Sequence, residues 1–264
     1  EITLSYDPRL LKTENFDNLL SETRKNFKIT ELQKLKELRK QDFDLGDFVR
    51  KELGYAGKIT SHLHHLCHLA SCYYPSGFND ALVISHDGIG EVDCSLMATA
   101  SNGEITIFHH GNQWPNSLGL LYAAITDYLG WKYNSDEGIV MGLAPYGDDT
   151  KLVKSTEKTY RDIFREIIST NDLDYEIDRS WIAFHEVRSK WVSDKFIKTF
   201  GDRRNPDESP QEYHKHVAAA LQNRLFWYCN EAGHLAVANQ AATRHRWRCG
   251  SASHCFACYG NGSG

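Results

Sequence analysis

Hydrophobic and polar residues alternate between residues 81 and 109, which is the spacing of β-strands rather than helices. Residues 81–85 form a short apolar run, and residues 92–100 place small and apolar side chains on one face. Asn102-Gly103 is a dipeptide typical of a tight hairpin turn. The pattern therefore predicts a buried strand, a glycine-containing turn at 87–90, and then an antiparallel hairpin.

Other stretches carry apolar residues at helical spacing. The clearest is 117–129, where Gly130 is expected to end the helix. Further helices are expected within 16–53, 156–169 and 211–231. The segment 134–147 combines polar turn residues with small residues, so we expect it to be a loop packed closely against another part of the protein.

A histidine-rich segment lies between these regions. Ser61 is expected to cap a short helix that Pro75 closes. His64 and His68 are four residues apart, so a helix places both imidazoles on one face, close enough to bind one divalent metal. Nitrogen ligands at this spacing suit iron or zinc. His62 and His65 leave the choice of pair open, and a histidine-rich surface helix without metal is the alternative interpretation.

Asp87-Gly-Ile-Gly90 follows the apolar strand directly. Glycine lets backbone amides approach a phosphate closely, and the Asp87 carboxylate can hold a metal or a water molecule. A simple hairpin turn explains the same residues. The short separation from the histidine helix indicates that helix and turn line one cleft.

Composition narrows the possible functions mainly by exclusion. The chain has 264 residues, and 30 Lys and Arg against 35 Asp and Glu give a formal net charge of −5, so no broad nucleic-acid-binding face is expected. No apolar run approaches the roughly 18 residues of a membrane helix. Seven cysteines without a regular framework favour a reduced, cytoplasmic protein.

Four motifs occur in a fixed order over about residues 50–150: His64-His-Leu-Cys-His68, Ala81-Leu-Val-Ile-Ser-His-Asp-Gly-Ile-Gly-Glu91, Pro115-Asn-Ser-Leu-Gly-Leu-Leu-Tyr122 and Met141-Gly-Leu-Ala-Pro-Tyr-Gly147. Together they resemble the O-carbamoyltransferases of the nodulation-factor and antibiotic-biosynthesis type. The resemblance implies an α/β fold of the actin-like ATPase kind, with two lobes. This fold is related to that of the enzymes that make threonylcarbamoyl-adenosine on tRNA.

The resemblance also implies a chemistry. Members of the family use ATP and carbamoyl phosphate to form carbamoyl-adenylate, and pass the carbamoyl group to a hydroxyl of a small-molecule acceptor such as a sugar or antibiotic. His64 and His68 would be the ligands of a divalent metal, Fe²⁺ by expectation, that contacts the nucleotide phosphates. Asp87, Gly88 and Gly90 would form a phosphate-side loop of the same site, with Asp87 as the catalytic residue. Neither nucleic acid nor membrane is an expected partner.

The expected organisation is that of an incomplete domain. Residues 1–78 would be the remainder of the first lobe, 79–233 the second lobe with the phosphate loop and an insertion, and 234–264 an aberrant, disordered tail. Where the family carries a glycine-rich nucleotide segment, this chain has His234-Leu-Ala-Val-Ala-Asn-Gln240, and no acidic residue follows Glu231. The third metal ligand is expected beyond the end of the chain.

Three functions therefore remain open from the sequence. The first is a carbamoyltransferase whose nucleotide site is truncated. The second is a non-catalytic remnant or binding module of the same fold. The third is a metal-dependent hydrolase that uses His64, His68 and Asp87 on a bound water molecule.

Overall fold

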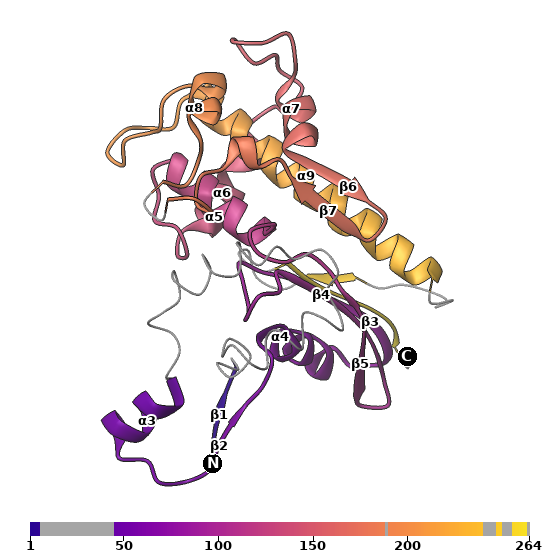
Figure 1. The fold of residues 1–264 in the computed structure, drawn as a ribbon. Coiled ribbons are helices and arrows are strands. Elements are labelled where there is room, and N and C mark those ends of the chain that lie inside the picture. Colours follow the sequence, from indigo (N-terminus) through magenta and orange to yellow (C-terminus); the bar gives the residue numbers. More distant parts are fainter. Residues whose placement is uncertain (6–44, 188–189, 240–246, 250–254, 263–264) are drawn as a thin grey trace.

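The computed structural model describes residues 1–5, 45–187, 190–239, 247–249 and 255–262. At its centre lies an antiparallel sheet in the order β5-β4-β3-β9-β8. Figure 1 shows helix α4 below this sheet and a layer of helices above it. The protein therefore has a mixed α/β fold. The strands are β3 (Phe78–His86), β4 (Ser95–Ser101), β5 (Glu104–His110), β8 (Trp247–Cys249) and β9 (Cys255–Gly262).

Strand β3 shows how the sequence builds the sheet. Its side chains point alternately to the two faces. Leu82 and Ile84 pack into a large hydrophobic cluster on the upper face, whereas Ala81 and Val83 pack into a smaller one against α4. A strand covered on both sides needs a nearly continuous apolar run, which is why residues 81–84 lack polar side chains.

The predicted hairpin is confirmed. Residues 95–101 and 104–110 pair in antiparallel fashion on either side of Asn102 and Gly103. Both turn residues have positive φ angles, of 50° and 85°. This backbone conformation is the one that Asn and Gly adopt most readily, and its twist matches that of the flanking strands.

The lower layer contains α4 (His64–Tyr73), followed by the 3-10 turn η2 (Tyr74–Ser76). The predicted cap is wrong: Ser61 lies in strand β2 (Ile59–Ser61), which pairs in parallel with β1 (Ile2–Leu4). The buried side of α4 carries His65, Leu69 and Tyr73. Helix α3 (Leu45–Leu53) precedes β2 in the chain, and the rest of the predicted helical region 16–53 lies outside the described residues.

The upper layer is larger. Helix α5 begins after Ser117, whose hydroxyl accepts a hydrogen bond from the Leu120 amide, and Gly130 follows its end, as predicted. The other elements are α6 (Glu137–Leu143), η3 (Ala144–Tyr146), α7 (Tyr160–Ile167), β6 (Ile168–Asn171), β7 (Asp174–Ile177), η4 (Arg179–Trp181), α8 (Asp194–Phe200) and α9 (Glu212–Asn239), with α5 spanning Leu118–Tyr128.

Two regions differ from the sequence-based expectation. Residues 137–146, expected to be a loop, form α6 and η3, although the expected close packing is present because Gly147 lies directly against the backbone of α9 at Lys215. The expected tail from residue 234 instead extends α9 to Asn239 and contributes strand β9, which covers the otherwise open edge of β3.

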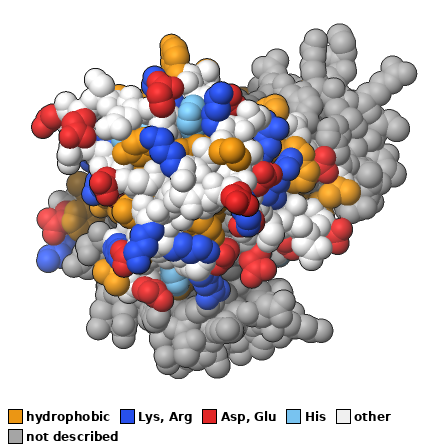
Figure 2. Space-filling view, turned by 90° about the horizontal axis from the view of Figure 1, so that it is seen from above, with side chains coloured by type: hydrophobic (Ala, Val, Ile, Leu, Met, Phe, Trp, Pro, Cys, Tyr) orange, Lys and Arg blue, Asp and Glu red, His pale blue; other side chains and the backbone are white. Residues whose placement is uncertain are grey.

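The surface over the helical layer has no single sign of charge. Figure 2 shows acidic and basic side chains intermixed on this face, with isolated hydrophobic side chains between them. None of the described helices combines the length and apolar character needed to cross a bilayer.

Candidate metal centre

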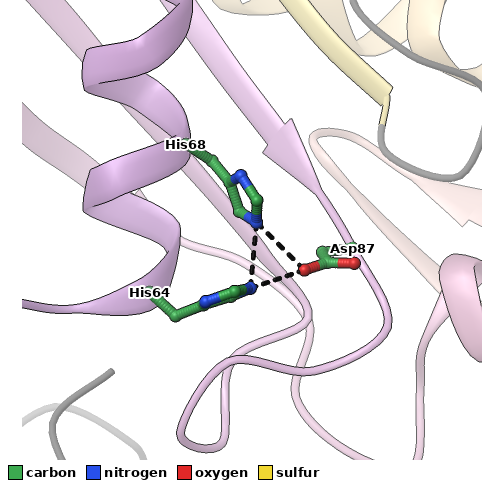
Figure 3. Close-up of side chains that lie close together, drawn as sticks. All are labelled: His64, His68 and Asp87. Atoms are coloured by element: carbon green, nitrogen blue, oxygen red, sulfur yellow. Dashed lines mark hydrogen bonds and ion pairs between the residues drawn. The ribbon is translucent and has the colours of Figure 1, made fainter. Parts of the chain in front are cut away.

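Three side chains that could bind a metal converge between α4 and the end of β3. His64 Nε2 lies 2.7 Å from Asp87 Oδ2, His68 Nε2 lies 3.1 Å from the same oxygen, and the two Nε2 atoms are 2.9 Å apart. Figure 3 shows both rings and the carboxylate pointing toward one another. Within the described ranges, no other group of three His, Cys, Asp or Glu residues meets in this way.

The secondary structure explains this convergence. His64 and His68 stand one turn apart on the same face of α4, with their ring centroids 4.4 Å apart. Asp87 follows the last residue of β3, and β3 packs directly against α4. The helix and the strand end therefore deliver two nitrogens and one oxygen to a single point.

The site is shielded but not sealed. The side chains of His64 and His68 are 25% and 21% exposed, and that of Asp87 is 10% exposed. Partial exposure leaves one side on which water or a ligand can reach the three atoms. A metal held by these three atoms would therefore keep an open coordination position, as reactive metal sites do.

The first described residues of the chain orient the His64 ring. His64 Nδ1 lies 3.0 Å from the carbonyl oxygen of Ser5. A carbonyl can only accept, so Nδ1 carries the hydrogen, and in the neutral ring Nε2 then presents its lone pair toward Asp87 and His68. In metal sites, a backbone carbonyl commonly fixes the tautomer of a metal-binding histidine in this way.

The electrostatics of the site favour a positive charge. Burial of the His64 ring disfavours its charged form, but the hydrogen bond and charge of Asp87, helped by the Ser5 carbonyl and Glu91, outweigh burial and raise the pKa of His64. A proton satisfies this field in the absence of metal. A divalent cation would satisfy it more fully.

The spacing of the donor atoms fits a six-coordinate ion. Neighbouring ligands at bonds of about 2.1 Å in an octahedron are about 3 Å apart, since the edge is √2 times the bond length. The observed separations of 2.7, 2.9 and 3.1 Å lie near that value. Two imidazoles and one carboxylate on one side of an ion leave the opposite positions open, which is the donor set preferred by non-haem ferrous iron.

The structure shows which histidines of this segment face Asp87, a choice that the sequence left open. His65 is buried, with Nδ1 2.7 Å from Ser85 Oγ and Nε2 2.8 Å from the Asp93 carbonyl, so both ring nitrogens are used within the core. Burial lowers its pKa to about 4, so the ring stays neutral. His62 is exposed and precedes the helix. His64 and His68 thus form the pair that faces Asp87.

The turn after Asp87 is bonded internally. The Gly88 amide donates to Asp87 Oδ1 at 2.5 Å, and the Gly90 amide donates to the Asp93 carbonyl at 2.8 Å. Both amides that the sequence assigned to a phosphate are therefore engaged by the protein itself. Their phosphate-binding role stays a prediction, and it requires the turn to exchange these bonds for bonds to a ligand.

Glycine is required here by close packing. A Cβ atom at Gly90 would lie 2.9 Å from His65 Cδ2 and 3.2 Å from His64 Cβ, so the turn presses directly on α4. On the other side, a Cβ at Gly119 in α5 would collide with the backbone of Asp87 and Gly88. The turn carrying Asp87 is thus clamped between two helices.

Three contributors to the site were not assigned from the sequence. Ser117 Oγ donates to the carbonyl of Asp87 at 3.0 Å, Ser5 orients His64, and Glu91 accepts the backbone amide of His64. Ser117 carried an N-cap signal, and Glu91 closes the motif that begins at Asp87. Nothing near Ser5 in the sequence indicates its role, because the contact depends on the β1–β2 pairing.

Comparison with known proteins identifies the family of this chain. The family described as "Carbamoyltransferase N-terminus" matches residues 13–231. The chain belongs to this family. The resemblance found in the four motifs is therefore confirmed, and the matched span contains His64, His68 and Asp87.

Relatives from bacteria agree with this assignment. The chain is 34% identical over 191 residues to the uncharacterized protein sll1178 of Synechocystis, which is 70% of this chain and 28% of the relative. It is 31% identical over 169 residues to the nodulation protein NolNO of Sinorhizobium fredii, covering 64% of this chain and 22% of the relative. With the nodulation protein NolO of Bradyrhizobium diazoefficiens the identity is 33% over 164 residues, covering 61% and 26%. The chain spans less than a third of the length of each.

Proposed function

We propose that this member of the carbamoyltransferase N-terminus family forms the metal- and ATP-binding part of a carbamoyltransferase. The reaction would transfer a carbamoyl group from carbamoyl phosphate, by way of carbamoyl-adenylate, to a hydroxyl of a small-molecule acceptor such as a sugar or antibiotic. The observation that carries the proposal is the convergence of His64, His68 and Asp87 on one point. The family match supports the carbamoyl chemistry.

The metal in this proposal is Fe²⁺. His64 Nε2, His68 Nε2 and Asp87 Oδ2 would hold it, and Asp87 would therefore serve as a metal ligand, which adds a third ligand from within the described chain. When bound, the cation would neutralise negative charge on the nucleotide phosphates. The Ser5 carbonyl keeps the proton of His64 on Nδ1, so that Nε2 remains available.

The fold in this proposal is that of an actin-like ATPase with two α/β lobes. A sheet covered by helices on both faces, with Asp87 at a strand end, is compatible with such a lobe. ATP would bind beside the metal, with Gly88 and Gly90 on its phosphate side. Since both glycine amides now bond within the protein, ATP binding would be accompanied by a rearrangement of residues 87–90.

The test measures iron after anaerobic reconstitution with ferrous salt and removal of excess metal. We expect the unaltered chain to retain iron, and His64→Ala, His68→Ala and Asp87→Ala to lose it. His62→Ala is the matched control, because His62 lies just outside the helix and is exposed. Equal iron in all five proteins, or none in the unaltered chain, would contradict the metal site.

Calorimetric titration with ATP then tests the nucleotide part. Binding that requires iron supports the proposal. Iron binding without any ATP binding would favour the interpretation as a non-catalytic binding module. Metal-dependent hydrolysis of a simple ester in the absence of ATP would instead favour a hydrolase.

A further inference from the structure

The helix that carries the two histidines lacks a cap of its own. The residue at the N-cap position of α4 is Leu63, and its side chain makes no capping hydrogen bond. The first amides of a helix have no partner within the helix, and one that is buried without a partner costs free energy. The first residue with such an amide is His64, which belongs to the metal centre itself.

Glu91 supplies the missing acceptor from another part of the chain. Its carboxylate oxygens lie 3.2 and 3.4 Å from the backbone nitrogen of His64. Glu91 is only 3% exposed, so its carboxylate is not a loosely held surface group. A carboxylate at the N-terminus of a helix also interacts favourably with the helix dipole.

This contact joins helix α4 to the connection that carries Asp87, and the relative position of these two segments sets the distances between the three donor atoms. Glu91 and Asp87 lie in the same connection between β3 and β4, whereas His64 and His68 lie on α4. Gly90 lets the turn approach the helix closely, and the Glu91 carboxylate then fixes the first turn of the helix against it. On the buried side of α4, His65 makes a second tie to Ser85 and Asp93.

We propose that Glu91 is a positioning residue of the metal centre, which sets the distance of His64 and His68 from Asp87 by binding the His64 amide. This inference rests on the proposed metal-binding function. Glu91 does not act on the substrate. It holds His64 and His68 in place relative to Asp87, as residues that hydrogen-bond to metal ligands do in other proteins.

The experiment compares Glu91→Ala, Glu91→Gln and the control Glu104→Ala in the full chain, with Co²⁺ as the probe. Glu104 is an exposed glutamate on β5. Affinity and the visible d–d absorption of bound Co²⁺ are measured together with urea unfolding. We expect Glu91→Ala to weaken Co²⁺ binding about 10- to 100-fold and to change the spectrum. Glu91→Gln should restore most of the affinity, since its amide oxygen can still accept the His64 N–H. Glu104→Ala should leave affinity and spectrum unchanged.

Three results would overturn the inference. The first is wild-type affinity and spectrum in Glu91→Ala. The second is an equal loss in Glu91→Gln, which would assign the effect to charge rather than to the hydrogen bond. The third is a lower free energy of unfolding in Glu91→Ala with an unchanged Co²⁺ absorption spectrum, which is the result expected of a merely structural residue. If Glu91→Ala does not fold, the inference is tested with Glu91→Gln and with deuterium exchange at its His64 amide. We expect Glu91→Gln to bind Co²⁺ with near wild-type affinity and its His64 amide to stay protected from exchange. Loss of either property overturns the inference. If the unaltered chain binds no Co²⁺, the proposed function fails and the inference fails with it.

Discussion

The two faces of the central sheet are held to their helices by different forces. Above the sheet, the large cluster contains fully buried aromatic side chains such as Phe164, Tyr128 and Phe196. Below it, α4 contributes the buried Leu69 and Tyr73 and the partly buried Cys72 to a small cluster, and polar contacts complete its attachment. We infer that the upper layer contributes most of the free energy of unfolding, whereas the polar contacts of the lower layer fix the positions of the His64 and His68 side chains. Hydrogen bonds are directional, so they can place donor atoms where apolar contacts cannot.

The largest expected effect lies in the upper layer. Phe164 is fully buried in the large cluster, and Phe164→Ala should lower the free energy of unfolding by about 3–5 kcal/mol, because it removes a buried ring and leaves a cavity. Urea unfolding measures the loss. The exposed Phe226, replaced in the same way, is the control and should change stability little. A cost below that of Phe226→Ala would break the assignment of stability to this layer.

The next effect is a pH dependence that arises below the sheet. The pKa of His65 is lowered by burial to about 4, whereas an unfolded histidine titrates near 6.5. The unfolded chain therefore takes up a proton before the folded one does, so the stabilising contribution is complete above about pH 6.5 and is lost as the pH falls toward about 4. The full contribution is about 3 kcal/mol.

Urea unfolding of the metal-free chain between pH 7.5 and 4.5 checks this prediction. His65→Gln should lose part of the slope that the unaltered chain shows. The pKa of His86 is also lowered, to about 3, so some slope should remain in the variant. An identical slope in both proteins would mean that His65 does not titrate as its burial requires.

A smaller effect is expected where the two layers meet. Gly119→Ala puts a methyl group into the backbone of Asp87 and Gly88, which must move. We expect a loss of about 1–3 kcal/mol in stability and about tenfold in metal affinity, because the displaced residue is one of the three proposed ligands. Competition with a chelator measures the affinity. A stability loss with unchanged affinity would separate the turn from the metal centre.

The matched control for Gly119 is Gly138. It lies in α6, is exposed, and has open space where a Cβ would stand. Gly138→Ala should stabilise the protein by up to about 1 kcal/mol, since alanine is the better helix former. Destabilisation of similar size in both variants would show that the effect at Gly119 is not specific to the turn.

Periodicity predicted the elements whose boundaries depend on local sequence. The strands predicted at 81–85 and 92–100, the Asn102-Gly103 turn and the helix predicted over 117–129 all follow from residues close together in the chain. The helix at 137–143 was missed because its two glycines and polar start resemble a loop, whereas its stability comes from packing against α9. Tertiary contacts here override local propensity.

For the candidate site, too, the sequence predicted the local features but not the long-range contacts. The spacing of His64 and His68 and the position of Asp87 after a strand were sufficient to name the three residues. Their meeting at a common point, and the burial of His65 away from it, depend on how α4 lies against β3. The roles of Ser5 and Glu91 come from contacts over 59 and 27 residues of sequence, respectively, which no local pattern encodes.

The most direct test of the central claim is a crystal structure of the chain reconstituted anaerobically with ferrous iron, with data collected at the iron absorption edge. We predict one strong anomalous peak about 2.1 Å from His64 Nε2, His68 Nε2 and Asp87 Oδ2. A peak elsewhere would contradict the proposed metal site, for example a peak at the pair formed by His109 Nε2 and Asp174 Oδ1, which are 2.9 Å apart. So would a refined structure with no iron between α4 and the turn.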